Sequence, residues 1–161
     1  GHFIHRRVPH QLVDTPGLLD RPMIDRNAIE MQAIAAVEHI GKLCIFLMDI
    51  TEKCGVSVEE QNNLLSEVKD LLPDIDMIVV VSKADLMEPL PANWEEVKQI
   101  EAEWDGEGEP ELPVLIDEEG CVTMSAIEDV GVQALRLEMV RRCKANMPTE
   151  RMSLPEGWYR T

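Results

Sequence analysis

Lys42–Asp49 (KLCIFLMD) and Met77–Ser82 (MIVVVS) are the two stretches of sequence that decide the fold. Each is a nearly continuous apolar run, too short for a typical helix, and each ends in a polar residue. Runs of this kind are typical of strands that helices cover on both faces, as in a parallel sheet. Because helix-like segments alternate with them, we predict an α/β protein with a mostly parallel sheet.

The segments around these runs supply the other expected elements. Helices are predicted where apolar residues recur at helical spacing, over about 25–40, 58–72, 94–104 and 128–145. Ser57 and Glu60 have the spacing of a capping box at the start of the second helix, and Pro73 ends it. Three short strands are expected over Phe3–Arg7, His10–Asp14 and Cys121–Met124, the first two joined by a turn at Val8-Pro9.

Composition excludes several classes of protein. The 161 residues include 15 Lys and Arg against 31 Asp and Glu, so the formal net charge is −16, which disfavours a general binder of nucleic-acid phosphates. No apolar run approaches the ~20 residues that span a bilayer, and nothing has the pattern of a secretory signal. We therefore expect no membrane association. The four cysteines lack metal-binding spacing and are expected to be thiols, which indicates a reducing compartment, so we expect a cytoplasmic location.

Most of the negative charge lies in Asn93–Glu119, which has eleven carboxylates against Lys98 alone. These carboxylates are not spaced like a calcium-binding loop. We therefore interpret 93–119 as an exposed acidic insertion within a domain spanning 1–147. Residues 148–161 are expected to form a loop-like tail.

Three short motifs each follow an expected strand. They are Asp14-Thr15-Pro16-Gly17, Ser82-Lys83-Ala84-Asp85 and Ser125-Ala126. Ligands of open α/β sheets bind at the carboxyl ends of the strands, in the loops that follow them. Each motif is weak by itself, but their order along an α/β chain indicates guanine-nucleotide binding.

The first motif suits the phosphate end of a nucleotide. Asp14 can hold the Mg²⁺ of GTP or GDP through water, and Thr15 lies in the same loop. The backbone N–H of Gly17 can approach a γ-phosphate because no Cβ intervenes. Loss of that phosphate would release the loop, as in the switches of GTPases.

The other two motifs suit the base. The Asp85 carboxylate can accept two N–H donors that guanine has and adenine lacks, and the stem of Lys83 can cover the base or the ribose. The backbone N–H of Ala126 can donate to the guanine carbonyl. Ser82 and Ser125 begin these two loops and complete the predicted binding set.

The residues around these motifs resemble one known family. DTPGLLDRP (14–22), DRNAIEMQAI (25–34) and KLCIFLMDITEKCGVSVEEQ (42–61) resemble the nucleolar GTP-binding protein (NOG-type) family of Obg-like, translation-factor-class GTPases. The archaeal members look most similar, and LPEGWYR (154–160) is similar to the end of those members. The resemblance implies a three-layer P-loop GTPase fold, hydrolysis of GTP to GDP by the complete domain, and a role in assembling the large ribosomal subunit through ribosomal RNA or ribosomal proteins.

The chain departs from the family pattern at two positions. Ser82 replaces the asparagine of the usual N-K-x-D motif, whose side chain ties neighbouring nucleotide loops together. Leu18 stands where many GTPases place a glutamine that orients water. We expect weaker nucleotide binding from the first change and slow intrinsic hydrolysis from the second.

The largest departure is the phosphate loop. The sequence contains no G-x-x-x-x-G-K-[ST], the motif whose backbone N–H groups and lysine hold the β- and γ-phosphates. The first strand and first helix of the family fold are also missing from the pattern, which would leave a gap between the His10 and Lys42 strands. The simplest account is that Gly1 marks an amino-terminal truncation.

Two functional hypotheses remain open. In the first, the chain is a fragment of a regulatory GTPase and is expected to be inactive alone, although its parent binds GTP and Mg²⁺. In the second, it is a degenerate G domain that serves as a protein or RNA interaction module without turnover. Ser82 and the missing phosphate loop favour the second hypothesis for this chain, and the intact motifs at Asp14 and Asp85 favour the first for its parent.

Overall fold

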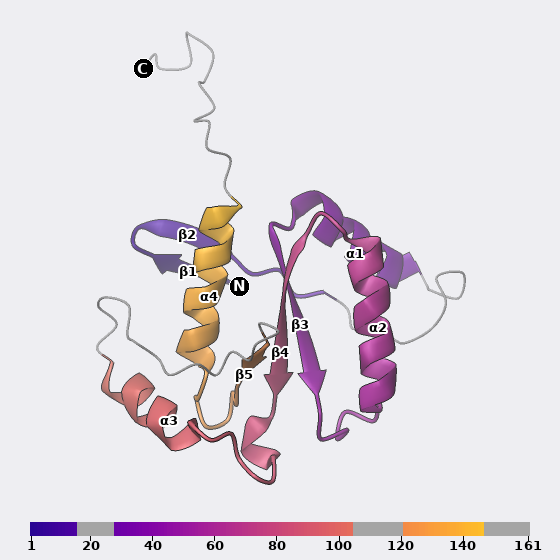
Figure 1. The fold of residues 1–161 in the computed structure, drawn as a ribbon. Coiled ribbons are helices and arrows are strands. Elements are labelled where there is room, and N and C mark those ends of the chain that lie inside the picture. The colour runs from indigo at the N-terminus through magenta and orange to yellow at the C-terminus, as the bar shows by residue number, and fades with distance from the viewer. Residues whose placement is uncertain (16–27, 105–120, 147–161) are drawn as a thin grey trace, which may run out of the picture.

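The computed structural model describes residues 1–15, 28–104 and 121–146 (Figure 1). The elements, in chain order, are β1 (His2–His5), β2 (Val8–Gln11), α1 (Ala28–Ile40), β3 (Leu43–Asp49), α2 (Val58–Leu71), β4 (Asp76–Ser82), the 3₁₀ helix η2 (Ala84–Leu86), α3 (Trp94–Glu103), β5 (Val122–Thr123) and α4 (Val132–Ala145).

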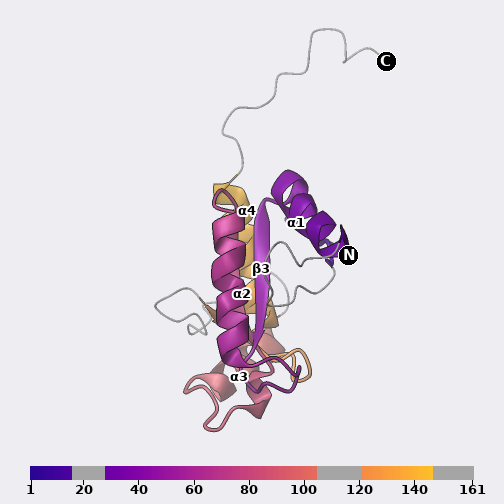
Figure 2. The ribbon, with the colours of Figure 1, turned by 90° about the vertical axis from the view of Figure 1, so that its right-hand side faces the viewer.

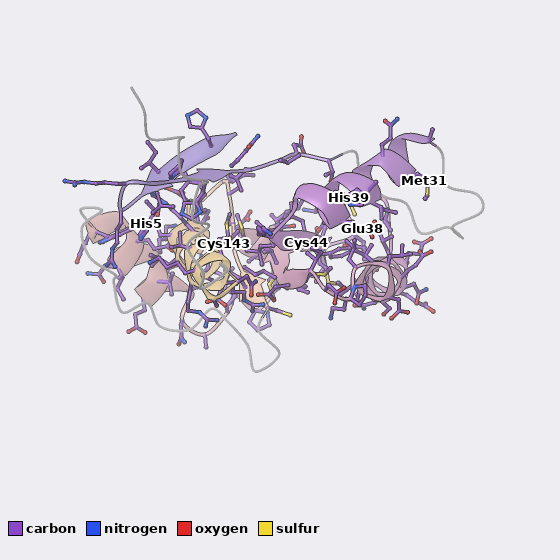
Figure 3. All side chains as sticks on the ribbon, turned by 90° about the horizontal axis from the view of Figure 1, so that it is seen from above. His5, Met31, Glu38, His39, Cys44 and Cys143 are labelled. Carbon is purple, nitrogen blue, oxygen red and sulfur yellow. The ribbon has the colours of Figure 1, made fainter. Side chains whose placement is uncertain are left out.

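The central sheet is parallel, as predicted. Its described strands have the order β3-β4-β5, with Leu43 opposite Asp76 and Asp49 opposite Ser82, so β3 and β4 end together. The turned view shows α2 against β3, with α4 on the other side of the sheet (Figure 2). From above, Cys44 of β3 lies between α2 and α4, which carries Cys143 (Figure 3). The α/β prediction is therefore confirmed.

Alternation along the strands gives the sheet two apolar faces. One face is covered by α1 and α2, whose buried residues Ile34, Leu64 and Val68 cluster with Phe46 of β3. The opposite face is covered by α4, where Leu135 and Met139 pack against Ile78, Val80 and Val122. Burial on both faces explains why the β3 and β4 sequences lack polar alternation.

The amino-terminal hairpin is a separate two-stranded sheet beside α4. Its turn is Arg6-Arg7, both with positive φ, so the predicted turn at Val8-Pro9 was wrong. Pro9 instead lies opposite Ile4. Gly1 and Leu12 exchange two backbone hydrogen bonds, and in an antiparallel ladder such pairs alternate with pairs that exchange none. The Ile4–Pro9 pair is one that exchanges none, so Pro9 needs no N–H donor.

Helix α2 begins as predicted. The Ser57 side chain accepts from the Glu60 N–H, and the Glu60 carboxylate accepts from the Ser57 N–H, which completes the capping box. The helix ends at Leu71, before Pro73. Its buried residues are Gln61, Leu64 and Val68, whereas Leu65 is only half-buried. Gln61 is a polar residue that is buried for a specific reason described below.

Helix α3 corrects the expectation for the acidic segment. The predicted helix exists, and Glu95, Glu96 and Glu103 are exposed, but Trp94 and Val97 are 2% and 0% exposed. These two side chains form a cluster with Ala84 and Val130, so α3 is part of the domain's packing and not simply an exposed insertion.

Several expectations lie outside the described residues. These are Pro16, Gly17 and Leu18 of the first motif, 105–120 of the acidic segment, and the tail 148–161. Of the described helices, none is long and apolar enough to cross a membrane. The structure records all four cysteines as thiols.

Candidate functional site

The loops after β4 and β5 lie side by side at the carboxyl end of the sheet. The Ala84 N–H donates to the Met124 carbonyl at 3.1 Å, and the Met124 N–H donates to the Val81 carbonyl at 2.9 Å. Ser125 is fully buried and pairs with Val130 through two backbone bonds of 2.9 and 3.0 Å, which closes the second loop. The structure thus brings the second and third predicted motifs together.

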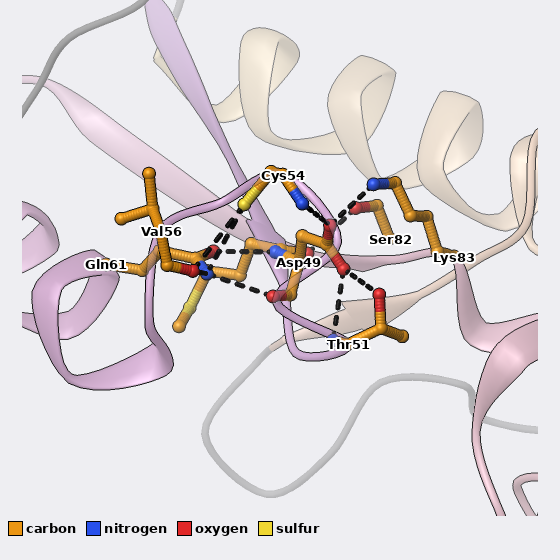
Figure 4. A network of polar contacts seen from close by, with 8 residues as sticks. Asp49, Thr51, Cys54, Val56, Gln61, Ser82 and Lys83 are labelled. Carbon is orange, nitrogen blue, oxygen red and sulfur yellow. Dashed lines mark hydrogen bonds and ion pairs between the residues drawn. The ribbon is translucent and has the colours of Figure 1, made fainter.

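Ser82 ties β4 to its neighbour. Its hydroxyl donates to the Met48 carbonyl of β3 at 2.8 Å, so the short side chain acts within the sheet (Figure 4). Lys83 follows in the left-handed region with φ 58°, which turns the chain sharply into η2. Its ammonium group lies 2.5 Å from Asp49 Oδ2, so Lys83 joins the ends of β3 and β4.

Asp49 is the centre of this polar network (Figure 4). It is only 6% exposed, and its carboxylate accepts from Thr51 N and Oγ1, from Cys54 N and from Lys83 Nζ. Burial disfavours its charged form, but the hydrogen bonds from Lys83 and Thr51 outweigh that cost, so the pKa of Asp49 is lowered. The carboxylate is therefore held ionised beside the site.

Gln61 completes the end of β3. Its side-chain oxygen accepts from Asp49 N at 2.7 Å, while its amide donates to the Asp49 carbonyl at 2.9 Å and the Val56 carbonyl at 3.0 Å. The side chain thus satisfies both backbone groups of Asp49 and reaches across the following loop. This explains why a polar residue is buried in α2.

Two polar groups at this edge have no partner within the part of the chain that the structure describes. The carboxylate of half-buried Asp85, in η2, and the backbone N–H of exposed Ala126 make no hydrogen bond to the protein there. One is an acceptor and the other a donor, and they lie on adjoining loops. That pairing is complementary to the edge of guanine, which offers N–H donors beside a carbonyl.

The structure describes only Asp14 and Thr15 of the first motif. Asp14 is exposed and Thr15 half-buried, and no hydrogen bond or ion pair joins either to the Ser82 or Ser125 loop. An exposed carboxylate without a described protein partner fits a Mg²⁺ ligand, since Mg²⁺ in nucleotide sites commonly takes one or two carboxylates and completes its shell with phosphates and water. In the described residues no three His, Cys, Asp or Glu are grouped to hold a metal.

Sequence reasoning missed three residues that shape the site: Asp49, Gln61 and Glu101. Asp49 had a visible signal, a charged residue closing an apolar run. Gln61 and Glu101 had none, because their partners are distant in sequence. Glu101 accepts from three backbone N–H groups at the start of α4, thirty or more residues away.

Comparison with known proteins identifies the family. Residues 28–85 match the family model described as Nucleolar GTP-binding protein 1 (NOG1). The chain is 35% identical to nucleolar GTP-binding protein 1 of Drosophila melanogaster over 144 residues, which cover 88% of this chain and 20% of that protein. It is 50% identical to an uncharacterized protein of the archaeon Methanocaldococcus jannaschii over 78 residues, 48% of this chain and 22% of that protein.

A solved structure supports the assignment over most of the chain. A crystal structure of nucleolar GTP-binding protein 1 from Plasmodium falciparum superposes with a TM-score of 0.63 at 30% identity, covering 91% of this chain and 70% of that one. The chain spans about a fifth of the length of the curated relatives it matches. Its fold is that of part of a G domain, and the chain belongs to the nucleolar GTP-binding protein 1 family.

Proposed function

We propose that this chain contributes the base-reading half of a guanine-nucleotide site. The observation that carries the proposal is the pair of adjoining groups at the carboxyl edge of the sheet, the Asp85 carboxylate and the Ala126 N–H, which have no partner in the described residues. Asp85 would accept from guanine N1 and N2, and Ala126 would donate to O6. The name of the family describes a GTP-binding protein, which supports the same ligand.

The phosphate end is proposed from the first motif. Asp14 would hold Mg²⁺ through water, and Thr15 and Gly17 would lie along the phosphates. Mg²⁺ supplies charge neutralisation for the β- and γ-phosphates when bound. GTP hydrolysis is proposed only for the longer protein, because this chain lacks a phosphate-loop motif.

Base recognition can be tested by reversing it. The full-length protein should bind fluorescent GDP at micromolar concentration or tighter, and GDP but not ADP should displace the probe. Asp85→Asn replaces an acceptor with an amide that can donate to the C2 carbonyl of xanthine. The affinity of this variant for GDP should therefore fall, and its affinity for xanthosine diphosphate should rise. Asp74→Asn, at an exposed position, is the matched control. Failure of the unmodified full-length protein to bind GDP would overturn the proposal.

We propose that the longer protein acts on precursors of the large ribosomal subunit. The support is the resemblance set out above and the relatives' names, which describe nucleolar proteins. Arg142 contributes little to such contacts, since its side chain is 20% exposed and pairs with Glu138 and Asp76, whereas the Arg141 side chain pairs with Glu138 but is 70% exposed. Exposed Arg7 at the hairpin turn remains available. Co-sedimentation of the full-length protein with large-subunit precursors tests this proposal. If the protein is found only in the fractions of unbound protein, the proposal is contradicted.

One observation favours the alternative, a G domain used as an interaction module. Ser82 and Lys83 already bond Met48 and Asp49, so two residues of the predicted binding set are engaged within the protein. The module hypothesis predicts partner binding that is unchanged by GDP, GTP or the Asp85→Asn substitution. Partner binding that depends on nucleotide would exclude it.

A further inference from the structure

Helix α3 packs behind both base-reading loops. The fully buried Val97 and nearly buried Trp94 cluster with Ala84, in the loop after β4, and with Val130, in the loop after β5. Lys98 adds an ion pair with Glu128 at 2.7 Å. One helix therefore contacts the two segments that we propose read the base.

The start of α4 depends on α3 for its capping. Gly131 occupies the N-cap position with φ 77° and has no side chain to cap the helix. Glu101 of α3 supplies the missing acceptors: Oε2 accepts from Gly131 N at 2.8 Å, and Oε1 accepts from Gln133 N at 3.1 Å and Ala134 N at 3.0 Å. A carboxylate at this end of a helix satisfies orphan N–H groups and complements the macrodipole.

This cap is connected directly to the predicted guanine contact. Gly131 follows Val130, and Val130 pairs with Ser125 through both of its backbone bonds. Ala126, whose N–H faces no described acceptor, is the next residue. That N–H is thus connected through Ser125, Val130 and Gly131 to the Glu101 carboxylate.

Resting on the proposed function, we propose that Glu101 is a positioning residue for guanine recognition: it holds the Ser125–Val130 loop so that the Ala126 N–H meets the O6 atom of the base. The role differs from that of an ordinary cap because the acceptor comes from a helix on the opposite side of the loop. Burial disfavours the charge of Glu101 more than its three hydrogen bonds favour it, so its pKa is raised.

The test compares nucleotides that differ by one contact. In the full-length protein, GDP is compared with 6-thio-GDP, whose sulfur is a poor acceptor for the Ala126 N–H. It is also compared with inosine diphosphate, which lacks the N2 group read by Asp85. Glu101→Ala should reduce the preference for GDP over 6-thio-GDP by about tenfold, the size of one hydrogen bond to a well-placed group. The preference for GDP over inosine diphosphate should stay within about twofold.

Two variants complete the design. Glu101→Gln keeps one oxygen that can accept from the Gln133 and Ala134 N–H groups, so it should recover part of the preference for GDP over 6-thio-GDP. This variant also takes the place of Glu101→Ala if Glu101→Ala does not fold. Glu96→Ala, exposed on the same helix, should change neither ratio. If Glu101→Ala leaves both affinity ratios unchanged, including the case in which it lowers the affinity for all three nucleotides equally, the positioning role is overturned.

Amide hydrogen exchange separates this inference from the proposed function. Without nucleotide, Glu101→Ala should speed exchange at the Ser125 and Val130 amides more than at Met124, whose N–H bonds the Val81 carbonyl. A protein that binds no GDP but shows this change refutes the nucleotide site alone. A protein that binds GDP but shows no change at Ser125 and Val130 refutes the role of Glu101 alone.

Discussion

Lys83 Nζ lies 2.5 Å from Asp49 Oδ2 and so joins the carboxyl ends of two neighbouring parallel strands. The lysine belongs to the predicted base-reading motif, whereas the aspartate closes an apolar run thirty-four residues earlier. The pair therefore couples the loop after β3 to the loop after β4. It also orients the Lys83 stem at the edge where the base is proposed to bind.

Asp49→Asn should destabilise the protein. The amide keeps only one acceptor oxygen, so it cannot replace both Oδ2, which accepts from Lys83 and the Cys54 N–H, and Oδ1, which accepts from Thr51. It also removes the negative charge that pairs with Lys83. We expect a loss of about 2–3 kcal/mol in the free energy of unfolding. Urea denaturation measures it, with Asp70→Asn on the exposed face of α2 as control. Equal midpoints for the two variants would show that the network contributes nothing to stability.

Ser82→Asn should strengthen nucleotide binding by the full-length protein. The serine hydroxyl reaches only the Met48 carbonyl, whereas the longer amide can also bond groups of a neighbouring nucleotide loop. We expect GDP affinity to rise about three- to tenfold, measured by fluorescent-GDP titration. Ser82→Ala is the control: it removes the bond to Met48 and should cost about 1 kcal/mol of stability without raising affinity. Unchanged or weaker GDP binding by Ser82→Asn would contradict this prediction.

The ion-pair network on α4 should make the protein sensitive to acid. The hydrogen bond from Arg141 outweighs burial, and with Arg142 it lowers the pKa of Glu138 from 4.5 to about 2. Because the folded pKa lies below the unfolded one, this stabilisation is full above about pH 4.5 and is lost as the pH falls towards 2.

Glu138→Gln should therefore flatten the fall in stability across that range. We expect a difference on the order of 2 kcal/mol between the two proteins at neutral pH, shrinking as the pH approaches 2. Urea unfolding at several pH values measures it. Glu96→Gln, at an exposed position, should show the same pH dependence of stability as the unmodified protein. Parallel curves for Glu138→Gln and the unmodified protein would refute the assignment.

Two glycines with positive φ should respond differently to alanine. At Gly55, with φ 84°, an added Cβ meets open space, so Gly55→Ala should cost only the backbone strain, about 1 kcal/mol. At Gly131, with φ 77°, the Cβ would collide with the Thr123 carbonyl oxygen, and the chain beside it is held by the Glu101 bond. Gly131→Ala should cost at least about 2 kcal/mol. Thermal unfolding compares the two, and equal losses would show that the β5–α4 contact is looser than described.

Much of the fold could be predicted from local sequence. The apolar runs at β3 and β4, the capping box at Ser57 and the break at Pro73 all follow from short-range chemistry, and the structure confirms each. The hairpin turn was missed because Arg6-Arg7 carries none of the residues that favour positive φ. The burial of Gln61 in α2 was not predicted, because it depends on hydrogen bonds to Asp49, which hydrophobic periodicity cannot show.

The sequence by itself determined the α/β class, the polar residues that follow the parallel strands, and a family resemblance that the comparisons confirm. These depend on residue type, spacing and order along the chain. Only the tertiary structure decided that Lys83 pairs with Asp49, that α3 is packed through Trp94 and Val97, and that Glu101 caps α4. The physical reason is range: strand and helix signals act over a few residues, whereas hydrogen bonds and burial join groups thirty or more positions apart.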